Sequence, residues 1–192
     1  PGLEQKVAQP TEELSASNAL LAQRANELAI INGIQEGMAA SLDFQAIVDL
    51  VGDKLRELFA TGNLSIRGWD PAEGLVQPLY ICEHGVRLSD EPFRPKPGGA
   101  IHRVLAGREV IVAGSRAEQE ARGFEIMPGT DSSLSVVGVP LTVGDRAIGA
   151  ILLENHDREH AFGESEVSLL TTVAASMGVA LENARLLAET QR

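Results

Sequence analysis

The sequence is poor in cysteine and in positive charge, and both scarcities narrow the kind of protein it can be. Cys82 is the only cysteine among 192 residues, which excludes an internal disulfide and a zinc site built on cysteines. A reducing cytoplasm is therefore the expected setting. Lys and Arg number 16 against 27 Asp and Glu, so the net charge is −11. Such a surface disfavours nucleic acid and anionic membranes as partners, because both attract clustered basic residues.

The sequence also lacks a long hydrophobic run. No apolar stretch approaches the roughly 18–20 residues that span a bilayer, and no signal peptide opens the chain. We therefore expect no membrane insertion. The apolar fraction of 44% is typical of globular domains. Because the chain begins at Pro1 rather than at a methionine, we expect it to be a segment of a longer protein.

A long amphipathic pattern ends the chain, over residues 164–189. One apolar line in it alternates steps of three and four, the heptad spacing that turns one helix face toward another helix. This line contains Val167, Leu170, Ala174, Met177, Leu181 and Ala184. A second apolar line lies beside it, so the helix has two surfaces to bury. We expect one surface to pack on the domain and the heptad line to contact a second copy of the chain.

A leucine repeat near the N-terminus has the same seven-residue period. Leu14, Leu21 and Leu28 follow Thr11, a suitable N-cap, and residues 1–10 are expected to fray. We interpret residues 1–40 as a helical linker that contributes to a homodimer, with a coiled coil favoured over an ordinary amphipathic helix. Two glycines four residues apart, at 33 and 37, indicate either a close helix contact or a bend where the linker meets the domain.

Between these helices, the hydrophobic periodicity changes from helical to alternating. It predicts a helix from 41 or 43 to about 60, strands over 63–69, 75–82, 109–113, 134–141 and 146–155, and a short helix over 100–105. Residues 84–98 and 114–132 are expected to be loops, the second with one helical turn, and Pro78 indicates an edge or a bulge. The order predicts an α+β fold: an antiparallel sheet of five to six strands with helices packed on it, between two long terminal helices.

The pattern as a whole resembles a GAF domain, a small-molecule sensor fold related to PAS domains. The resemblance covers roughly residues 41–188 and rests on Ala106–Ile111, Val136–Leu141, Ile148–Leu152, Phe162 with Glu166, Leu169-Leu170 and Ala180–Leu186. It implies a sensor domain over residues 41–181 and an outgoing signalling helix that starts at 182–192. Bacterial sensor proteins with several domains carry such flanking helices, and an output domain such as a cyclase or a histidine kinase would follow.

Particular residues bear on the ligand classes that the resemblance implies. Cyclic-nucleotide-binding members carry Asn-Lys and Phe-x-x-x-Asp-Glu, where this chain has Asn155-His156 and Phe162 followed by Glu166-Val167. Because the Lys–Asp pair is lost, a cyclic nucleotide is the less favoured ligand, and Phe162 and Glu166 can simply close and cap the last helix. Cys82 does not resemble a bilin attachment site. A reductase of this fold needs thiol exchange between cysteines, so we expect no enzymatic activity.

The histidines are the remaining candidates for binding a metal ion or an anion. His156 and His160 are four residues apart, but they lie in a polar loop with no further ligand set, and we interpret them as solvated. We therefore expect no metal, haem or bilin. His102 follows Gly98-Gly99, where backbone N–H groups could hold an anion, although a plain glycine turn is the preferred interpretation.

The predicted function is that of a regulatory sensor. A small ligand, unidentified from the sequence, would lie between the sheet and the loops at 84–102 and 114–133, and dimeric helices would relay its presence. The candidate ligand-binding residues, chosen from their loop or strand positions, are Tyr80, Ile101, His102, Phe124 and Ser135. The alternative is a structural dimerisation domain whose pocket is filled by its own side chains.

Overall fold

The computed structural model describes residues 2–125 and 131–191 and has the predicted α+β fold, with a six-stranded antiparallel sheet. The strands are Leu64–Asp70 (β1), Leu75–Glu83 (β2), Val86–Leu88 (β3), Ile111–Ala113 (β4), Ser135–Val143 (β5) and Arg146–Asn155 (β6). The helices are Gly2–Ala39 (α1), Phe44–Leu58 (α2), Ala100–Leu105 (α3), Arg116–Ala121 (α4) and Glu164–Thr190 (α5). The strand order is β3-β2-β1-β6-β5-β4.

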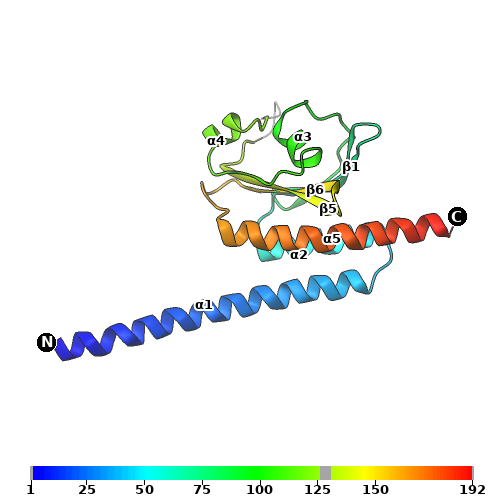
Figure 1. Cartoon of the computed structure of the whole chain (residues 1–192). Coiled ribbons are helices and arrows are strands. Elements are labelled where there is room, and N and C mark those ends of the chain that lie inside the picture. Colours follow the sequence, from blue (N-terminus) through cyan, green and yellow to red (C-terminus); the bar gives the residue numbers. More distant parts are fainter. Residues whose placement is uncertain (1, 126–130, 192) are drawn as a thin grey trace.

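The sheet lies between two layers (Figure 1). On one side, which we call the helix face, α2 and α5 pack on the strands. The C-terminal half of α1 packs against α2 and α5, and its N-terminal end projects away from the domain. On the other side, the loop face, α3, α4 and their connecting segments cover the sheet. Both terminal helices therefore lie on the helix-face side of the sheet, with α1 packed on the outside of α2 and α5.

Side-chain alternation along β6 divides the core in two. Ile151 and Leu153 belong to a helix-side cluster, whereas Ala150 and Leu152 belong to a loop-side cluster. The buried members of the loop-side cluster are Val76, Ala100, Val104, Leu105, Ile111, Ala150 and Leu152. The helix-side cluster is larger and includes side chains from α1, α2, α5 and the central strands. Both faces of β6 are covered, which agrees with its nearly continuous apolar sequence.

The heptad line on α5 packs inside the chain rather than against a second chain. Leu170, Ala174, Met177, Leu181 and Ala184 are each 2% exposed or less and belong to the helix-side cluster, and Val167 packs at its edge. The structure thus corrects the prediction that these residues form a dimer interface. A stripe that faces a sheet and a heptad seam have nearly the same period, so spacing alone did not separate them.

The same packing explains the apolar composition of α5. Among the described helices, α5 alone is long and apolar enough to cross a membrane by length and composition, and 44% of its most apolar window is buried inside the fold. Its apolar line contacts β5 and α2. These are the features of a core helix.

The C-terminal end of α1 is part of the core. Ile34 and Met38 are 1% and 5% exposed in the helix-side cluster. A Cβ atom on Gly37 would overlap the side chain of Leu50 in α2, whereas nothing lies within 4 Å of such an atom on Gly33. Of the two interpretations of this glycine pair, the close helix contact is confirmed at Gly37.

The N-terminal part of α1 makes no such contact along its leucines. Leu14, Leu21 and Leu28 are 62%, 60% and 59% exposed. The helix also runs through Pro10 instead of beginning after it, contrary to the expected N-cap at Thr11. Asp43 caps α2, since its side chain accepts a hydrogen bond from the N–H of Ala46 at 2.8 Å.

The segment at 84–98 contains a strand that we predicted as loop. β3 pairs with the end of β2, and the backbone of Phe93 forms a bridge with that of Val76. This segment is therefore tied to the edge of the sheet before it reaches α3.

Candidate ligand-binding face

The candidate site lies on the loop face, where α3 packs on the sheet. Gly138 of β5 allows this approach, because a Cβ atom there would lie 3.3 Å from the side chain of Val104. Around the loop-side cluster, four partly buried side chains form an edge: Trp69, Phe93, Ile101 and Phe124. Three of the four are aromatic, so this edge offers apolar and stacking contacts to a flat ligand.

The two loops predicted to close over the ligand meet at this face. The N–H of Ala100 donates to the carbonyl oxygen of Gly123 at 3.1 Å. Nearby, Nη1 of Arg103 donates to the carbonyl oxygen of Arg122 at 3.2 Å. Lys96 and Glu125 form an ion pair at 3.2 Å. The start of α3 and the end of the α4 segment therefore form one covering layer.

Two guanidinium groups lie at this edge, and both have acidic partners. Arg67 is 14% exposed, forms an ion pair with Asp90 at 3.1 Å and lies 5.3 Å from the ring centre of Phe93. Arg103 pairs with Glu109 at 3.1 Å. An anionic group on a ligand would have to compete with these carboxylates.

The structure brings three of the predicted residues to the α3 side of the sheet. Ile101 and Phe124 pack at the edge of the loop-side cluster. Nδ1 of His102 accepts a hydrogen bond from the N–H of Gly98 at 3.3 Å. Because the protein itself uses this N–H, the glycine-turn interpretation is favoured over an anion site.

Tyr80 lies on the opposite face from the predicted site. A β-bulge in β2, between the pairs Ile66–Tyr80 and Arg67–Pro78, shifts the alternation by one residue. Val76 consequently faces the loop-side cluster and Tyr80 the helix-side cluster. The structure corrects the placement of Tyr80 in the pocket, and it confirms the bulge that Pro78 indicated.

Tyr80 instead makes a buried polar contact with α2. Its hydroxyl donates to Oδ1 of Asp53 at 2.7 Å and accepts from Nη1 of Arg56 at 3.4 Å. Desolvation by burial raises the pKa of Tyr80, a shift that the hydrogen bond from Arg56 opposes. The guanidinium of Arg87 lies 3.7 Å from the ring centre. These contacts serve the packing of α2 on β2.

Ser135 is also unavailable to a ligand on the loop face. It is fully buried, and its hydroxyl donates to the carbonyl oxygen of Arg158 at 2.9 Å. Because side chains alternate between the two faces along β5, Ser135 lies on the same face as Val137, which belongs to the helix-side cluster. Its placement in the pocket is likewise corrected.

One buried carboxylate links α5 to the β5–β6 hairpin. Glu182 is 8% exposed, and its Oε1 lies 2.8 Å from Nη2 of Arg185 and 2.5 Å from Nη2 of Arg146. Hydrogen bonds from Arg185 and then from Arg146 lower the pKa of Glu182 to about 2, although burial opposes the shift. Glu182 could not be paired with Arg146 from the sequence, because the two residues are distant in the chain.

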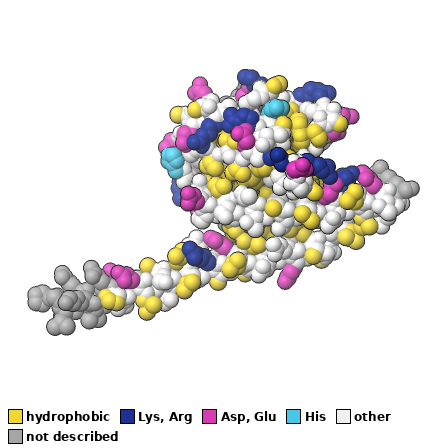
Figure 2. All heavy atoms as spheres, in the orientation of Figure 1, with side chains coloured by type: hydrophobic (Ala, Val, Ile, Leu, Met, Phe, Trp, Pro, Cys, Tyr) yellow, Lys and Arg dark blue, Asp and Glu magenta, His cyan; other side chains and the backbone are white. Residues whose placement is uncertain are grey.

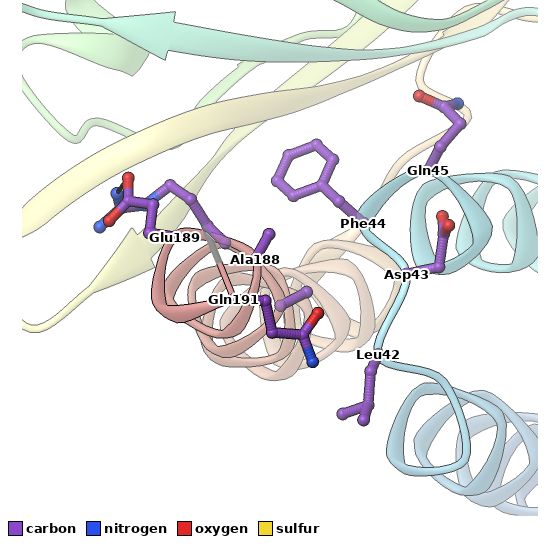
Figure 3. A pocket seen from close by; sticks show the side chains of 9 residues that line it. Leu42, Asp43, Phe44, Gln45, Ala188, Glu189 and Gln191 are labelled. Carbon is purple, nitrogen blue, oxygen red and sulfur yellow. Dashed lines mark hydrogen bonds and ion pairs between the residues drawn. The ribbon is translucent and has the colours of Figure 1, made fainter.

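An open groove lies at the end of the helix layer (Figure 3). It has a volume of about 620 Å³ and separates the first turn of α2 from the last turns of α5. The ring of Phe44 points across it toward α5, and Leu42 is 66% exposed beside it. Its lining residues are Leu42, Asp43, Phe44, Gln45, Ala184, Arg185, Ala188, Glu189 and Gln191. The groove therefore lies where the chain enters and leaves the domain.

Comparison with known proteins identifies the fold family. The family model of the GAF domain matches residues 43–181, more than half of the chain. The chain belongs to the GAF domain family. A comparison with curated proteins gave no match.

Solved GAF domains share this fold at low sequence identity. The GAF domain of a phosphoenolpyruvate-protein phosphotransferase from Coxiella burnetii has 18% identity and a TM-score of 0.71, covering 86% of this chain and 98% of its own. The corresponding domain from Acinetobacter has 17% identity and a TM-score of 0.70, covering 83% and 94%. Free methionine-R-sulfoxide reductase from Neisseria meningitidis, in complex with its substrate, has 20% identity and a TM-score of 0.69, covering 85% and 92%.

The signature positions of cyclic-nucleotide-binding GAF domains have structural partners here. Oδ1 of Asn155 accepts from the N–H groups of Asp157 and Arg158 at 2.9 and 2.8 Å. Oε2 of Glu166 accepts from the N–H of Gly163 at 2.9 Å and caps α5. The capping role expected for Glu166 is confirmed.

Cys82 is remote from the loop face of this GAF domain. It is 2% exposed in the helix-side cluster, two residues after Tyr80 on β2. The thiol therefore packs as a small apolar group.

Proposed function

We propose that this GAF domain is a cytoplasmic regulatory sensor, which binds a small ligand on the loop face and relays its presence through α5 and α1 to an output domain of the parent protein. The observation that carries this proposal is the position of β6 between two clusters. Ala150 and Leu152 contact the layer that would bind the ligand, and Ile151 and Leu153 contact the layer that contains the terminal helices. A change in the packing of α3 therefore acts on the strand that supports α5.

The contacts of α5 would allow it to transmit a structural change from the sheet to the terminal helices. Gly178 lies against the backbone of Thr142 in β5, and Glu182 pairs with Arg146 at the start of β6. Farther along, α5 passes the first turn of α2, next to the connection from α1. A shift of β5 and β6 would consequently reach both the incoming and the outgoing helix. To cause such a shift, the ligand must bind two arrangements of these helices with different affinities.

Homodimer formation through the N-terminal helix is part of the proposal. The line formed by Leu14, Leu21 and Leu28 is about 60% exposed on α1, where Figure 2 shows hydrophobic side chains spaced along the projecting helix. Exposed leucines that recur every seven residues favour helix pairing. On α5, Val179 and Leu186 are 53% and 47% exposed and provide a contact surface separate from the buried heptad line.

Two further observations support a regulatory rather than a catalytic role. The reductase neighbour acts on a substrate, but thiol exchange needs an accessible cysteine with a partner, and this chain has one buried thiol. A similar domain, at 19% identity and a TM-score of 0.67, comes from a methyl-accepting chemotaxis protein. Regulatory parent proteins of this kind agree with the proposed role.

The test is native mass spectrometry of the chain purified from cells, followed by a thermal-shift screen of metabolites and nucleotides. We expect a retained or stabilising small molecule, because a ligand that binds the folded state raises the melting temperature. Phe124→Ala should reduce binding, whereas Tyr80→Phe is the matched control, since Tyr80 faces the helix side. Equal loss in both variants would contradict a site on the loop face.

A structural dimerisation domain is the second candidate function. It is favoured by the filling of the loop-side cluster, whose central members Val76, Ala100, Val104 and Leu105 are 1% exposed or less. A chain that retains no molecule and gains no stability from any compound, yet forms a dimer, would favour this role over sensing.

A further inference from the structure

A group of histidine and carboxylate side chains lies at one end of the sheet, apart from the loop-side cluster. Nε2 of His84 and Oδ2 of Asp131 are 3.1 Å apart, and the ring centres of His84 and His156 are 5.0 Å apart. One ligating atom from each of the three residues lies within 4.8 Å of the others. His160, four residues after His156, is not part of this group, because its ring lies against Gly114.

The backbone around Asn63 holds the two histidine-bearing segments together. Oδ1 of Asn63 accepts from the N–H of His84 at 2.9 Å, and its carbonyl oxygen accepts from the N–H of Glu154 at 3.0 Å. Asn63 itself is 8% exposed. The turn at His84 and the end of β6 are therefore fixed to the same residue, which keeps the two imidazoles adjacent.

We infer that His84, Asp131 and His156 form a binding site for a first-row divalent transition-metal ion, with Zn²⁺ as the representative. Two imidazoles and one carboxylate are a ligand set that such ions prefer, and a water molecule can complete a tetrahedron. Metal–ligand bonds of about 2.0–2.1 Å place the ligating atoms of a tetrahedral site about 3.3–3.4 Å apart. The separation of 3.1 Å between His84 and Asp131 is close to this value, and the ligating atom of His156, within 4.8 Å of the other two, has to move closer.

The surroundings of the group also suit a cation. Oε2 of Glu154 lies 3.9 Å from Nε2 of His156 and places a carboxylate beside the imidazole. Glu83 adds a further negative charge near Glu154. The ring of His156 is only 16% exposed, so the site has one sheltered side. As an ion pair alone, the contact between His84 and Asp131, 57% and 76% exposed, contributes little to stability.

The chain contains four histidines, which gives a matched set of variants. The experiment is calorimetric titration of ZnCl₂ into the full chain, without a histidine tag and after removal of metals by a chelator. We expect one ion per chain and an affinity at least tenfold weaker in His84→Asn, His156→Gln and Asp131→Asn. Asparagine is chosen at position 84 because it tolerates the left-handed backbone there, where φ is 49°. His102→Gln and His160→Gln are the controls and should bind Zn²⁺ as the unaltered chain does.

Cobalt(II) gives a second measurement that does not depend on the stability of the variants. Bound in a tetrahedral site of the unaltered chain, Co²⁺ should produce visible absorption that Zn²⁺ then displaces in equimolar amount. The inference is overturned if the unaltered chain binds neither ion. It is also overturned if a folded double variant, His84→Asn with His156→Gln, retains Zn²⁺ affinity within twofold.

Discussion

Gly178 of α5 lies so close to Thr142 of β5 that a Cβ atom at this position would overlap the carbonyl oxygen of Thr142. Helix and strand therefore meet through their backbones. We expect Gly178→Ala to lower the free energy of unfolding by about 1–3 kcal/mol, because neither backbone can yield without disturbing the core around Met177. Urea denaturation measures this change.

Gly33 provides the control for this substitution. It also lies in a helix, but no atom lies within 4 Å of a Cβ built there. Gly33→Ala should raise the free energy of unfolding by about 0.5–1 kcal/mol through helix propensity alone. A stabilising effect at both positions would contradict the backbone contact between α5 and β5.

The ion pairs of Glu182 predict a pH-dependent contribution to stability. Its pKa is about 2 in the fold against 4.5 as the reference value, so the carboxylate stabilises the fold above about pH 4.5. This contribution is lost as the pH falls toward 2. We expect Glu182→Gln to lower the free energy of unfolding by about 1–2 kcal/mol at neutral pH. The difference from the unaltered chain should shrink between about pH 4.5 and pH 2, as measured by denaturation at several pH values.

Glu189 is the matched control for this effect. It also pairs with Arg185, but its side chain is 59% exposed. Exposed ion pairs contribute about 0–1 kcal/mol, so Glu189→Gln should change stability little at any pH. Equal losses of stability in the two variants would contradict the stabilising effect assigned to the buried ion pairs of Glu182.

The proposed dimer contact through the leucine line on α1 can be tested with a variant that loses self-association but still folds. Replacing Leu14, Leu21 and Leu28 by glutamine should weaken self-association at least tenfold, while the unfolding transition of the domain is retained, because these side chains are exposed in the single chain. Analytical ultracentrifugation from about 1 to 100 μM covers the relevant range of affinities.

Leu20 provides the comparison for the leucine line. It is 49% exposed on the same helix but lies outside the seven-residue repeat, so Leu20→Gln should leave self-association unchanged. A chain that is monomeric throughout this concentration range would remove the basis for the proposed dimer.

We expect a substitution of Tyr80 to change the stability of the domain without changing ligand binding. Tyr80→Phe removes the hydrogen bonds with Asp53 and Arg56 and should lower the free energy of unfolding by about 1 kcal/mol. The ring remains buried beneath Arg87, so the strand keeps its place. Any small molecule retained by the unaltered chain should still be retained, as native mass spectrometry can determine.

Most of the fold could be predicted from local patterns. The apolar face of α2 and the continuous apolar sequence of β6 are short-range signals, and the structure contains both of them. β3 was missed because a strand of three residues is too short to show a period. The heptad line on α5 was assigned to the wrong partner, since periodicity reports an apolar face and does not report what covers it.

The candidate site was less predictable for a different reason. Ile101 and Phe124 could be placed near it from their positions in loops. Tyr80 was assigned to the wrong face because a single bulge reverses the alternation along β2. His84 and His156 lie far apart in the sequence and meet only because β2 and β6 both end beside Asn63. Pro78 indicated an edge or a bulge but not which face Tyr80 would take, and no local pattern reports a contact between distant strand ends.

The burial of Ile34 and Met38 in the helix-side cluster bears on how this domain can be combined with others. A fusion or truncation that begins at the family boundary, residue 43, would discard two core side chains together with the helix that carries them. Burying a large aliphatic side chain is worth about 1.5–3 kcal/mol, so the shortened domain would lose a substantial fraction of its stability. We therefore expect domain exchange to preserve stability only when the junction lies upstream of Ile30 and Ile31, which also pack against the helix-side cluster.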